Sequence, residues 1–166
     1  RRFVQVSETL ELPVLVLTPP KHLERRQRRR DVRVNLPSAD RLMARLWAQT
    51  GEGASAELAP LPEMEVLDLS AGGMRLHFPK REGCPVSEGD RLVTLLPLHE
   101  GSPPLKLEAQ ATRAARVPGG GTHLGIEFTG LEGPEGRRHY HALQRFVAKR
   151  EREEIARAAG RKEPAP

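Results

Sequence analysis

Short apolar runs with the length and spacing of β-strands recur through the middle of this chain, and turns rich in Gly, Pro and Ser separate them. No long helical pattern lies between one run and the next, which favours antiparallel pairing over βαβ units. We therefore predict an all-β fold, a closed antiparallel barrel. The runs span residues 32–36, 42–47, 64–69, 74–78, 91–98, 105–117 and 123–128.

The region before the barrel has two parts. Residues 2–17 alternate and then run apolar, which predicts one or two strands that end at Pro19 and Pro20. Residues 21–33 hold seven Lys and Arg side chains against two acidic ones. A charge block of this kind is typical of a solvated linker or an anion-binding arm.

The C-terminal region changes character after Gly133 and Pro134. Apolar side chains recur there at spacings of three and four residues, with charged side chains between them, which predicts an amphipathic helix within residues 131–159. We expect its first half to pack on the barrel and its highly charged second half to project into solvent or meet a partner. Residues 160–166 are expected to form a disordered tail.

Composition narrows the class of partner. The net charge of +5 and the pI near 10.0 favour anionic partners. A single cysteine, Cys84, excludes an internal disulfide and a cysteine-rich metal site. No signal-type segment and no run long enough for a membrane span is visible, so we expect a cytoplasmic protein. A chain that opens at Arg1-Arg2 is expected to be a piece of a longer one.

Two short segments carry the candidate chemistry. In the first, Arg29 and Arg33 have R-x-x-x-R spacing where the basic arm enters a strand, and Arg28 precedes them. The planar guanidinium group binds phosphate or the O6/N7 edge of guanine through two parallel hydrogen bonds, and it can also stack on a base. Such a group suits a nucleotide better than the point charge of a lysine.

The second segment is D-x-S-x-x-G, at Asp68, Ser70 and Gly73, in a turn between two predicted strands. Asp68 can accept hydrogen bonds from the N1–H and N2–H₂ edge of guanine, and Ser70 offers a donor and an acceptor. Gly72 and Gly73 are expected to allow a tight turn with positive φ and a close approach of ligand to backbone. Together the two segments predict a guanine-nucleotide receptor without catalytic machinery.

Taken singly, each segment has an ordinary structural explanation. An arginine run before a strand is most often a solvated linker, and D-x-S-x-x-G is a common turn in which Asp and Ser bond their own backbone. The functional prediction therefore depends on the order and spacing of the two segments together.

On these residues the chain resembles the PilZ family of cyclic di-GMP receptors, whose signature is R-x-x-x-R followed by (D/N)-x-S-x-x-G. The resemblance covers roughly residues 24–150. It implies a six-stranded antiparallel barrel with a C-terminal helix, with the ligand bound on the outer surface of the barrel under the basic arm. The residues implied to bind cyclic di-GMP are Arg28, Arg29, Arg33, Asp68, Ser70, Gly72 and Gly73.

The resemblance carries two finer expectations. In the family, arginine just before the first signature arginine accompanies an intercalated ligand dimer, so Arg28 implies two cyclic di-GMP molecules per site. The junction around Thr18 resembles that of two-domain, YcgR-like flagellar-brake proteins. Residues 1–20 would then be the end of a truncated N-terminal domain, residues 21–33 the arm, and residues 34–130 the barrel.

We expect ligand binding to order the arm and thereby change a domain angle or a partner surface, in motility or biofilm control. The expected protein partner is a flagellar motor or another effector; no cofactor, metal, nucleic acid or membrane span is expected. The chain shows no Ser-His-Asp or paired-carboxylate arrangement, and His139 and His141 are poorly spaced as metal ligands on a helix. Two alternatives stay open: a degenerate PilZ adaptor that acts through protein contacts, and a basic nucleic-acid-binding barrel.

Overall fold

The computed structural model describes residues 4–6, 15–17, 31–37, 41–51, 57–79 and 84–160. The chain divides into two compact units, Arg1–Arg30 and Asp31–Pro166. In the first unit, β1 (Val4–Val6) pairs antiparallel with β2 (Leu15–Leu17), which confirms the strands predicted within residues 2–17.

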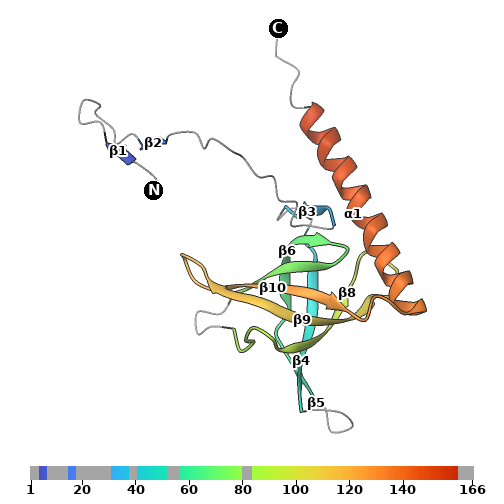
Figure 1. Cartoon of the computed structure of the whole chain (residues 1–166). Coiled ribbons are helices and arrows are strands. Elements are labelled where there is room, and N and C mark those ends of the chain that lie inside the picture. Colours follow the sequence, from blue (N-terminus) through green and yellow to red (C-terminus); the bar gives the residue numbers. More distant parts are fainter. Residues whose placement is uncertain are drawn as a thin grey trace. The chain divides into compact units, whose positions relative to one another are not determined.

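The second unit is a closed antiparallel barrel (Figure 1). Its strands run in the order β3-β6-β7-β10-β9-β8-β4-β5, and a further pairing of β6 with β4 closes a ring of six, with β3 and β5 as additions to it. The predicted six-stranded barrel is therefore confirmed. The strands are β3 (Arg33–Asn35), β4 (Met43–Thr50), β5 (Glu57–Pro60), β6 (Met64–Ser70), β7 (Gly73–Phe78), β8 (Arg91–Leu96), β9 (Leu105–Arg116) and β10 (Thr122–Thr129).

The strand β5 had no counterpart among the predicted runs. All four of its residues are exposed, and it pairs only with β4 among the described strands. An edge strand with no buried face shows no apolar alternation, and Pro60 also weakens the strand signal. Most other strands of the barrel alternate between more and less buried residues, as strands of a barrel with a filled interior do.

The interior of the barrel is filled mainly by aliphatic side chains, as the low aromatic content predicts. Side chains at alternate positions of facing strands reach it, and the region beneath the helix is continuous with it. The largest fully buried side chains are Phe78, Leu46, Met64, Leu69, Met74, Leu76, Leu92, Leu96, Leu107, Leu124, Leu143 and Val66.

The helix α1 (Pro134–Gly160) follows the last strand of the barrel. Proline suits its first position because the amide N–H there has no intrahelical partner. Leu143, Phe146 and Val147 are buried, so the first half packs on the barrel as predicted. The second half extends past the barrel (Figure 1), and no helix in the described part of the chain is long and apolar enough to cross a membrane.

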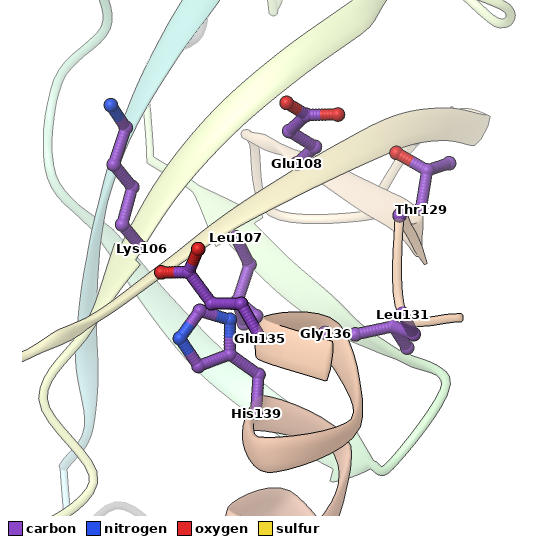
Figure 2. Close-up of a pocket in the computed structure, with 9 residues that line it drawn as sticks. Lys106, Leu107, Glu108, Thr129, Leu131, Glu135, Gly136 and His139 are labelled. Carbon is purple, nitrogen blue, oxygen red and sulfur yellow. The ribbon is translucent and has the colours of Figure 1, made fainter. Parts of the chain in front are cut away.

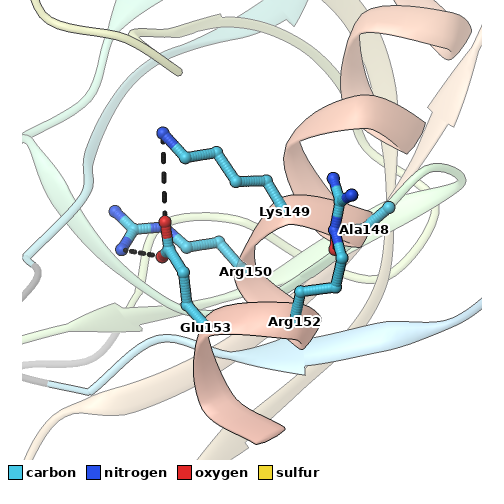
Figure 3. A network of polar contacts seen from close by, with 5 residues as sticks. All are labelled: Ala148, Lys149, Arg150, Arg152 and Glu153. Carbon is cyan, nitrogen blue, oxygen red and sulfur yellow. Dashed lines mark hydrogen bonds and ion pairs between the residues drawn. The ribbon is translucent and has the colours of Figure 1, made fainter. Parts of the chain in front are cut away.

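Charged side chains support the second half of α1 along its own surface (Figure 3). Glu153 lies 3.9 Å from Nζ of Lys149 and 3.2 Å from Nη1 of Arg150, and Arg152 donates a hydrogen bond of 3.1 Å to the carbonyl of Ala148. Pairs three or four residues apart each add a few tenths of a kcal/mol, about 0.2–0.5 kcal/mol, to helix stability. They help this projecting part to remain helical without a core beneath it.

Candidate functional site

Asp68 lies in β6, and its carboxylate is buried between two arginines of the neighbouring strands β3 and β7. Its Oδ1 lies 3.2 Å from Nη1 of Arg33, and its Oδ2 lies 2.7 Å from Nε of Arg75. The Asp68 side chain is 4% exposed, while those of Arg33 and Arg75 are 37% and 44% exposed. The two guanidinium groups compensate for the water that burial removes from this carboxylate. Asp68 therefore holds both guanidinium groups on the outer surface of the barrel.

The buried Oδ1 of Asp68 retains hydrogen-bonding capacity. It accepts no hydrogen bond from the residues that the structure describes, even though Arg33 is close to it. Buried acceptors without a partner are rare in folded proteins and call for an explanation. Its neighbour Arg33 is partly exposed, so a ligand N–H that reaches this side of the barrel would find an unused acceptor beside that arginine.

The turn between β6 and β7 brings Ser70, Gly72 and Gly73 beside this carboxylate. Ser70 is buried, and its hydroxyl donates a hydrogen bond of 3.0 Å to the carbonyl of Gly73. The donor of Ser70 is thus used within the turn, and its oxygen lone pairs remain as acceptors.

The predicted positive φ is wrong at both glycines, because neither Gly72 nor Gly73 has one. Both positions are glycine because other atoms approach closely. A Cβ on Gly73 would collide with the carbonyl oxygen of Ile126 in β10, and a Cβ on Gly72 would lie 2.9 Å from Oδ2 of Asp31. Close packing therefore fixes the turn against β10 on one side and against the residues that lead into β3 on the other.

Asp31 connects this turn to the C-terminal helix. Its Oδ1 accepts a hydrogen bond of 2.6 Å from the hydroxyl of Tyr140 in α1, while its Oδ2 covers Gly72. Asp31 lies within the R-x-x-x-R segment, two residues before Arg33. Asp31, which leads into β3, is thus coupled to the helix as well as to the barrel turn.

The structure brings five of the seven predicted site residues together: Arg33, Asp68, Ser70, Gly72 and Gly73. In the pairing of β3 with β6, Arg33 lies directly opposite Ser70. Arg28 and Arg29 lie outside the described residues.

Beside Arg33 and Arg75, the outer surface of the barrel has a hollow of about 450 Å³, which we call the cationic hollow. This volume falls within the range of ligand sites, roughly 300–1,000 Å³. Its lining residues come from β3, β7, β9 and β10: Arg33, Met74, Arg75, Thr112, Arg113, Ala115, His123, Gly125 and Ile126.

His123 contributes a titratable group to the cationic hollow. Its ring packs edge to face on that of His77, with centroids 5.6 Å apart. Partial burial lowers the pKa of His123 below the ordinary 6.5, and the positive charges of Arg75 and His77 lower it further against the opposing effect of Asp68. The imidazole is therefore neutral at pH 7 and able to donate one N–H.

A second hollow, of about 410 Å³, lies where β9 and the end of β10 meet the first turn of α1 (Figure 2). We call it the acidic hollow. Glu108 and Glu135 outnumber the one lysine, Lys106, and His139 lies beside them. Two carboxylates against one ammonium group disfavour an anionic ligand there.

The sequence pointed to part of the cationic surface and missed the rest. Arg75, two residues after Gly73, is exposed on a strand whose alternation predicts an outward side chain. Arg113 and His123 join it only through the register of β7, β10 and β9, which no local pattern in the sequence reveals.

Comparison with known proteins agrees with the fold described above. A family model described as PilZ domain matches residues 24–149. A comparison with curated proteins finds no match.

Among solved structures, the chain is similar to the PilZ domain with c-di-GMP of YcgR from Escherichia coli, with a TM-score of 0.57 and 21% identity over 82% of this chain and 100% of that one. It is also similar to E. coli YcgR in complex with c-di-GMP (TM-score 0.58, 24% identity, 96% of this chain and 62% of that one). A third match is the Bacillus subtilis inhibitor of motility MotI/DgrA (TM-score 0.60, 18% identity, 92% of this chain and 65% of that one). At these identities the matches show the shared fold, and the chain spans less than two thirds of the two longer relatives.

Proposed function

Because this chain belongs to the PilZ domain family, we propose that it is a non-catalytic receptor for cyclic di-GMP. The observation that carries the proposal is the buried carboxylate of Asp68, which joins the two signature segments by holding Arg33 beside the turn of Ser70 and Gly73. Two solved structures with the same fold, both of E. coli YcgR, are described as containing c-di-GMP.

Each predicted site residue has a role in this proposal. Arg28 and Arg29 bring guanidinium groups from the basic arm onto guanine and phosphate. Arg33, which is partly exposed, contributes a further guanidinium from β3. These groups supply the positive charge that a dinucleotide with two phosphodiesters requires.

The barrel supplies the opposite wall of the site. Asp68 positions Arg33, and its Oδ1 accepts an N–H from the edge of a guanine. The oxygen of Ser70 accepts a further hydrogen bond, and the backbone at Gly72 and Gly73 meets the ligand. No step breaks or forms a covalent bond, so the protein acts as an effector.

We further propose that two cyclic di-GMP molecules bind together, because an arginine, Arg28, precedes the first signature arginine. In a calorimetric titration the molar ratio should settle at two ligands per chain. A ratio of one would rule out the intercalated dimer and leave the receptor proposal standing.

The proposed output is a change in the arm, residues 21–33, which ligand and barrel would clamp between them. In this proposal residues 1–20 are the end of an N-terminal domain, as in YcgR-like proteins, and the clamp alters its angle or exposes a surface to a motor protein or another effector. The ligand can shift the population of the two conformations, with the arm clamped or released, only by as much as its affinity differs between them.

The test is calorimetry with cyclic di-GMP on the wild type, on Arg29→Ala, and on Arg26→Ala as a matched loss of charge outside the signature. We expect micromolar binding or tighter for the wild type and Arg26→Ala, and at least a tenfold loss for Arg29→Ala, since a charge-assisted contact is worth about 1.5–3 kcal/mol. Absence of heat with the wild type, or equal affinity in all three proteins, would refute the proposal.

Salt dependence separates this ligand from a nucleic acid. A cyclic dinucleotide has few phosphates, so its affinity should fall only slightly between 50 and 200 mM salt, whereas a polyanion held by many phosphate contacts loses affinity by orders of magnitude, roughly 10³–10⁵-fold. Tight binding of single-stranded RNA or DNA with a steep salt slope would favour the nucleic-acid alternative.

A further inference from the structure

An outward-facing row of residues crosses the barrel from the candidate site into the cationic hollow. Asp68 in β6 lies directly opposite Arg75 in β7, Arg75 lies opposite Gly125 in β10, and Gly125 lies opposite Arg113 in β9. Residues paired directly across antiparallel strands project to the same face of the sheet. Arg113 therefore shares a surface with Asp68 although 45 residues separate them in sequence.

A β-bulge gives Arg113 this outward position. Along β9, Leu107, Ala109 and Ala111 are buried, and continued alternation would turn residue 113 inward as well. The pairing of β9 with β10 shifts at Gly125, so that Thr112 is an extra residue in β9. A bulge of this kind redirects the side chains that follow it. Here it places the guanidinium of Arg113 outside the barrel.

Gly125 leaves the space between the two arginines open. It has no side chain and lies between Arg75 and Arg113 in the row, at the floor of the cationic hollow. Its φ lies outside the left-handed region, so backbone conformation does not require glycine. A Cβ at this position would lie 3.2 Å from Oγ1 of Thr112 and 3.8 Å from Cβ of Arg113, so a larger side chain would crowd the residues that line the hollow.

The charges in the hollow are incompletely compensated. Arg33, Arg75 and Arg113 contribute three guanidinium groups, and Asp68 contributes one carboxylate. Arg75 is fixed by its contact with Asp68, whereas Arg113 forms no ion pair with the described residues. His123 adds an N–H donor beside them. Exposed cations converging on an open hollow concentrate anions there.

We propose that Arg75, Arg113 and His123 form a phosphate subsite over Gly125, which extends the ligand site beyond the signature residues. The inference rests on the proposed function, because it assigns to this subsite a phosphodiester of the bound cyclic dinucleotide. The signature turn holds one side of the ligand, and the row across β7, β10 and β9 holds another. This arrangement supplies additional positive charge for a second ligand molecule.

The first test removes one charge from the subsite. Arg113→Gln should weaken cyclic di-GMP binding by about tenfold or more, because a charge-assisted contact to phosphate is lost. Arg116→Gln is the matched control: it removes the same charge from another exposed position of the same strand, three residues further on and outside the hollow. Its affinity should stay within about twofold of the wild type, since a charge outside the contact acts only through screened attraction.

The second test fills the hollow without changing its charge. Gly125→Leu should abolish the contact sterically and weaken binding by about tenfold or more, as the loss of Arg113 does. A circular dichroism melt would check that the variant folds. If Gly125→Leu does not fold, the affinity of Arg113→Gln alone decides whether the subsite exists, because that substitution alters only an exposed side chain.

Failure of this inference differs from failure of the proposed function. If the wild type binds and both Arg113→Gln and Gly125→Leu bind equally well, the subsite is refuted and the receptor function stands. If Arg113→Gln and Arg116→Gln weaken binding equally, only general electrostatic attraction acts and the subsite is again refuted. If the wild type does not bind, the proposed function is refuted and the subsite with it.

Discussion

The two hollows on the barrel unit have nearly equal volumes, about 450 and 410 Å³, and opposite character. The cationic hollow is lined by Arg33, Arg75 and Arg113, and one buried carboxylate, that of Asp68, pairs with the first two of them. In the acidic hollow, two glutamates face one lysine. Volume alone would therefore assign a ligand to either, and the charge and its compensation decide between them. On this ground we assign the proposed anionic dinucleotide to the first.

The largest loss of ligand affinity is expected when the carboxylate that organises the cationic hollow is removed. Asp68→Asn keeps the shape but releases Arg33 and Arg75, and it removes an acceptor for a guanine N–H. We expect a loss of cyclic di-GMP affinity of about a hundredfold, the value of two weakened charge-assisted contacts at about 1.5 kcal/mol each. Calorimetry would measure it. Glu135→Gln in the acidic hollow is the control. An equal loss of cyclic di-GMP affinity in that variant would contradict the assignment of the ligand to the cationic hollow.

Each of the two regions contains a glycine that is packed closely against a backbone carbonyl. A Cβ on Gly73 would collide with the carbonyl of Ile126, and a Cβ on Gly136 would collide with the carbonyl of Gly130. Both Gly73→Ala and Gly136→Ala should therefore lower the free energy of unfolding, by about 1–3 kcal/mol as overpacked sites do. Urea denaturation would measure both. Of the two folded variants, only Gly73→Ala should bind the ligand more weakly. If Gly73→Ala binds as tightly as the wild type, the turn can be displaced without harm to the site.

Loss of the contact between Asp31 and Tyr140 should lower the stability of the protein by a smaller amount. Tyr140→Phe removes the hydroxyl that donates the 2.6 Å hydrogen bond to Asp31. We expect a loss of stability of about 0.5–1.5 kcal/mol, typical of one hydrogen bond. If this bond restrains the signature segment, ligand affinity should change as well, whereas His139→Ala on the same helix should leave affinity unchanged. An unchanged free energy of unfolding would show that this hydrogen bond does not contribute to stability.

The smallest expected effect is a pH dependence specific to the cationic hollow. Burial and the charges of Arg75 and His77 hold the pKa of His123 below 6.5 in the free protein. A phosphodiester next to the ring favours the protonated form, so binding raises this pKa and takes up protons. Affinity should then increase by about two- to threefold as pH falls from 8 to 6. Calorimetry should show no such trend for His123→Gln.

The same group has a predicted effect on stability with the opposite sign. Because the folded pKa of His123 lies below its unfolded value of 6.5, the unfolded chain binds more protons at acid pH. This contribution to stability is present above about pH 6.5 and is lost as pH falls. Thermal melts of the ligand-free protein should therefore show a weaker acid destabilisation for His123→Gln than for the wild type. An identical pH profile would contradict the depressed pKa.

The sequence predicted most of the barrel because its strands alternate and end at clear turns. The run at 64–69 corresponds to β6 (Met64–Ser70), and the run at 74–78 to β7 (Gly73–Phe78). The edge strand β5 (Glu57–Pro60) was missed since it buries nothing and so leaves no pattern. Strand prediction from sequence depends on a buried face, and β5 lacks one.

The candidate site was predictable only where its residues are neighbours in sequence. Asp68, Ser70 and Gly73 lie within one turn, so their proximity follows from spacing. Arg113 was missed because a bulge at Thr112 sets its direction, and a bulge is a property of pairing between strands. His123 was missed because its neighbours, Arg75 and His77, come from another strand.

The most direct test of the central claim is an amide NMR titration of this chain with cyclic di-GMP. We expect chemical-shift changes concentrated in the cationic hollow and the signature turn, at Arg33, Ser70, Arg75, Arg113 and Gly125, with none of comparable size around Lys106, Glu108 and Glu135. Shifts concentrated around the acidic hollow, or no shifts at saturating ligand, would contradict it.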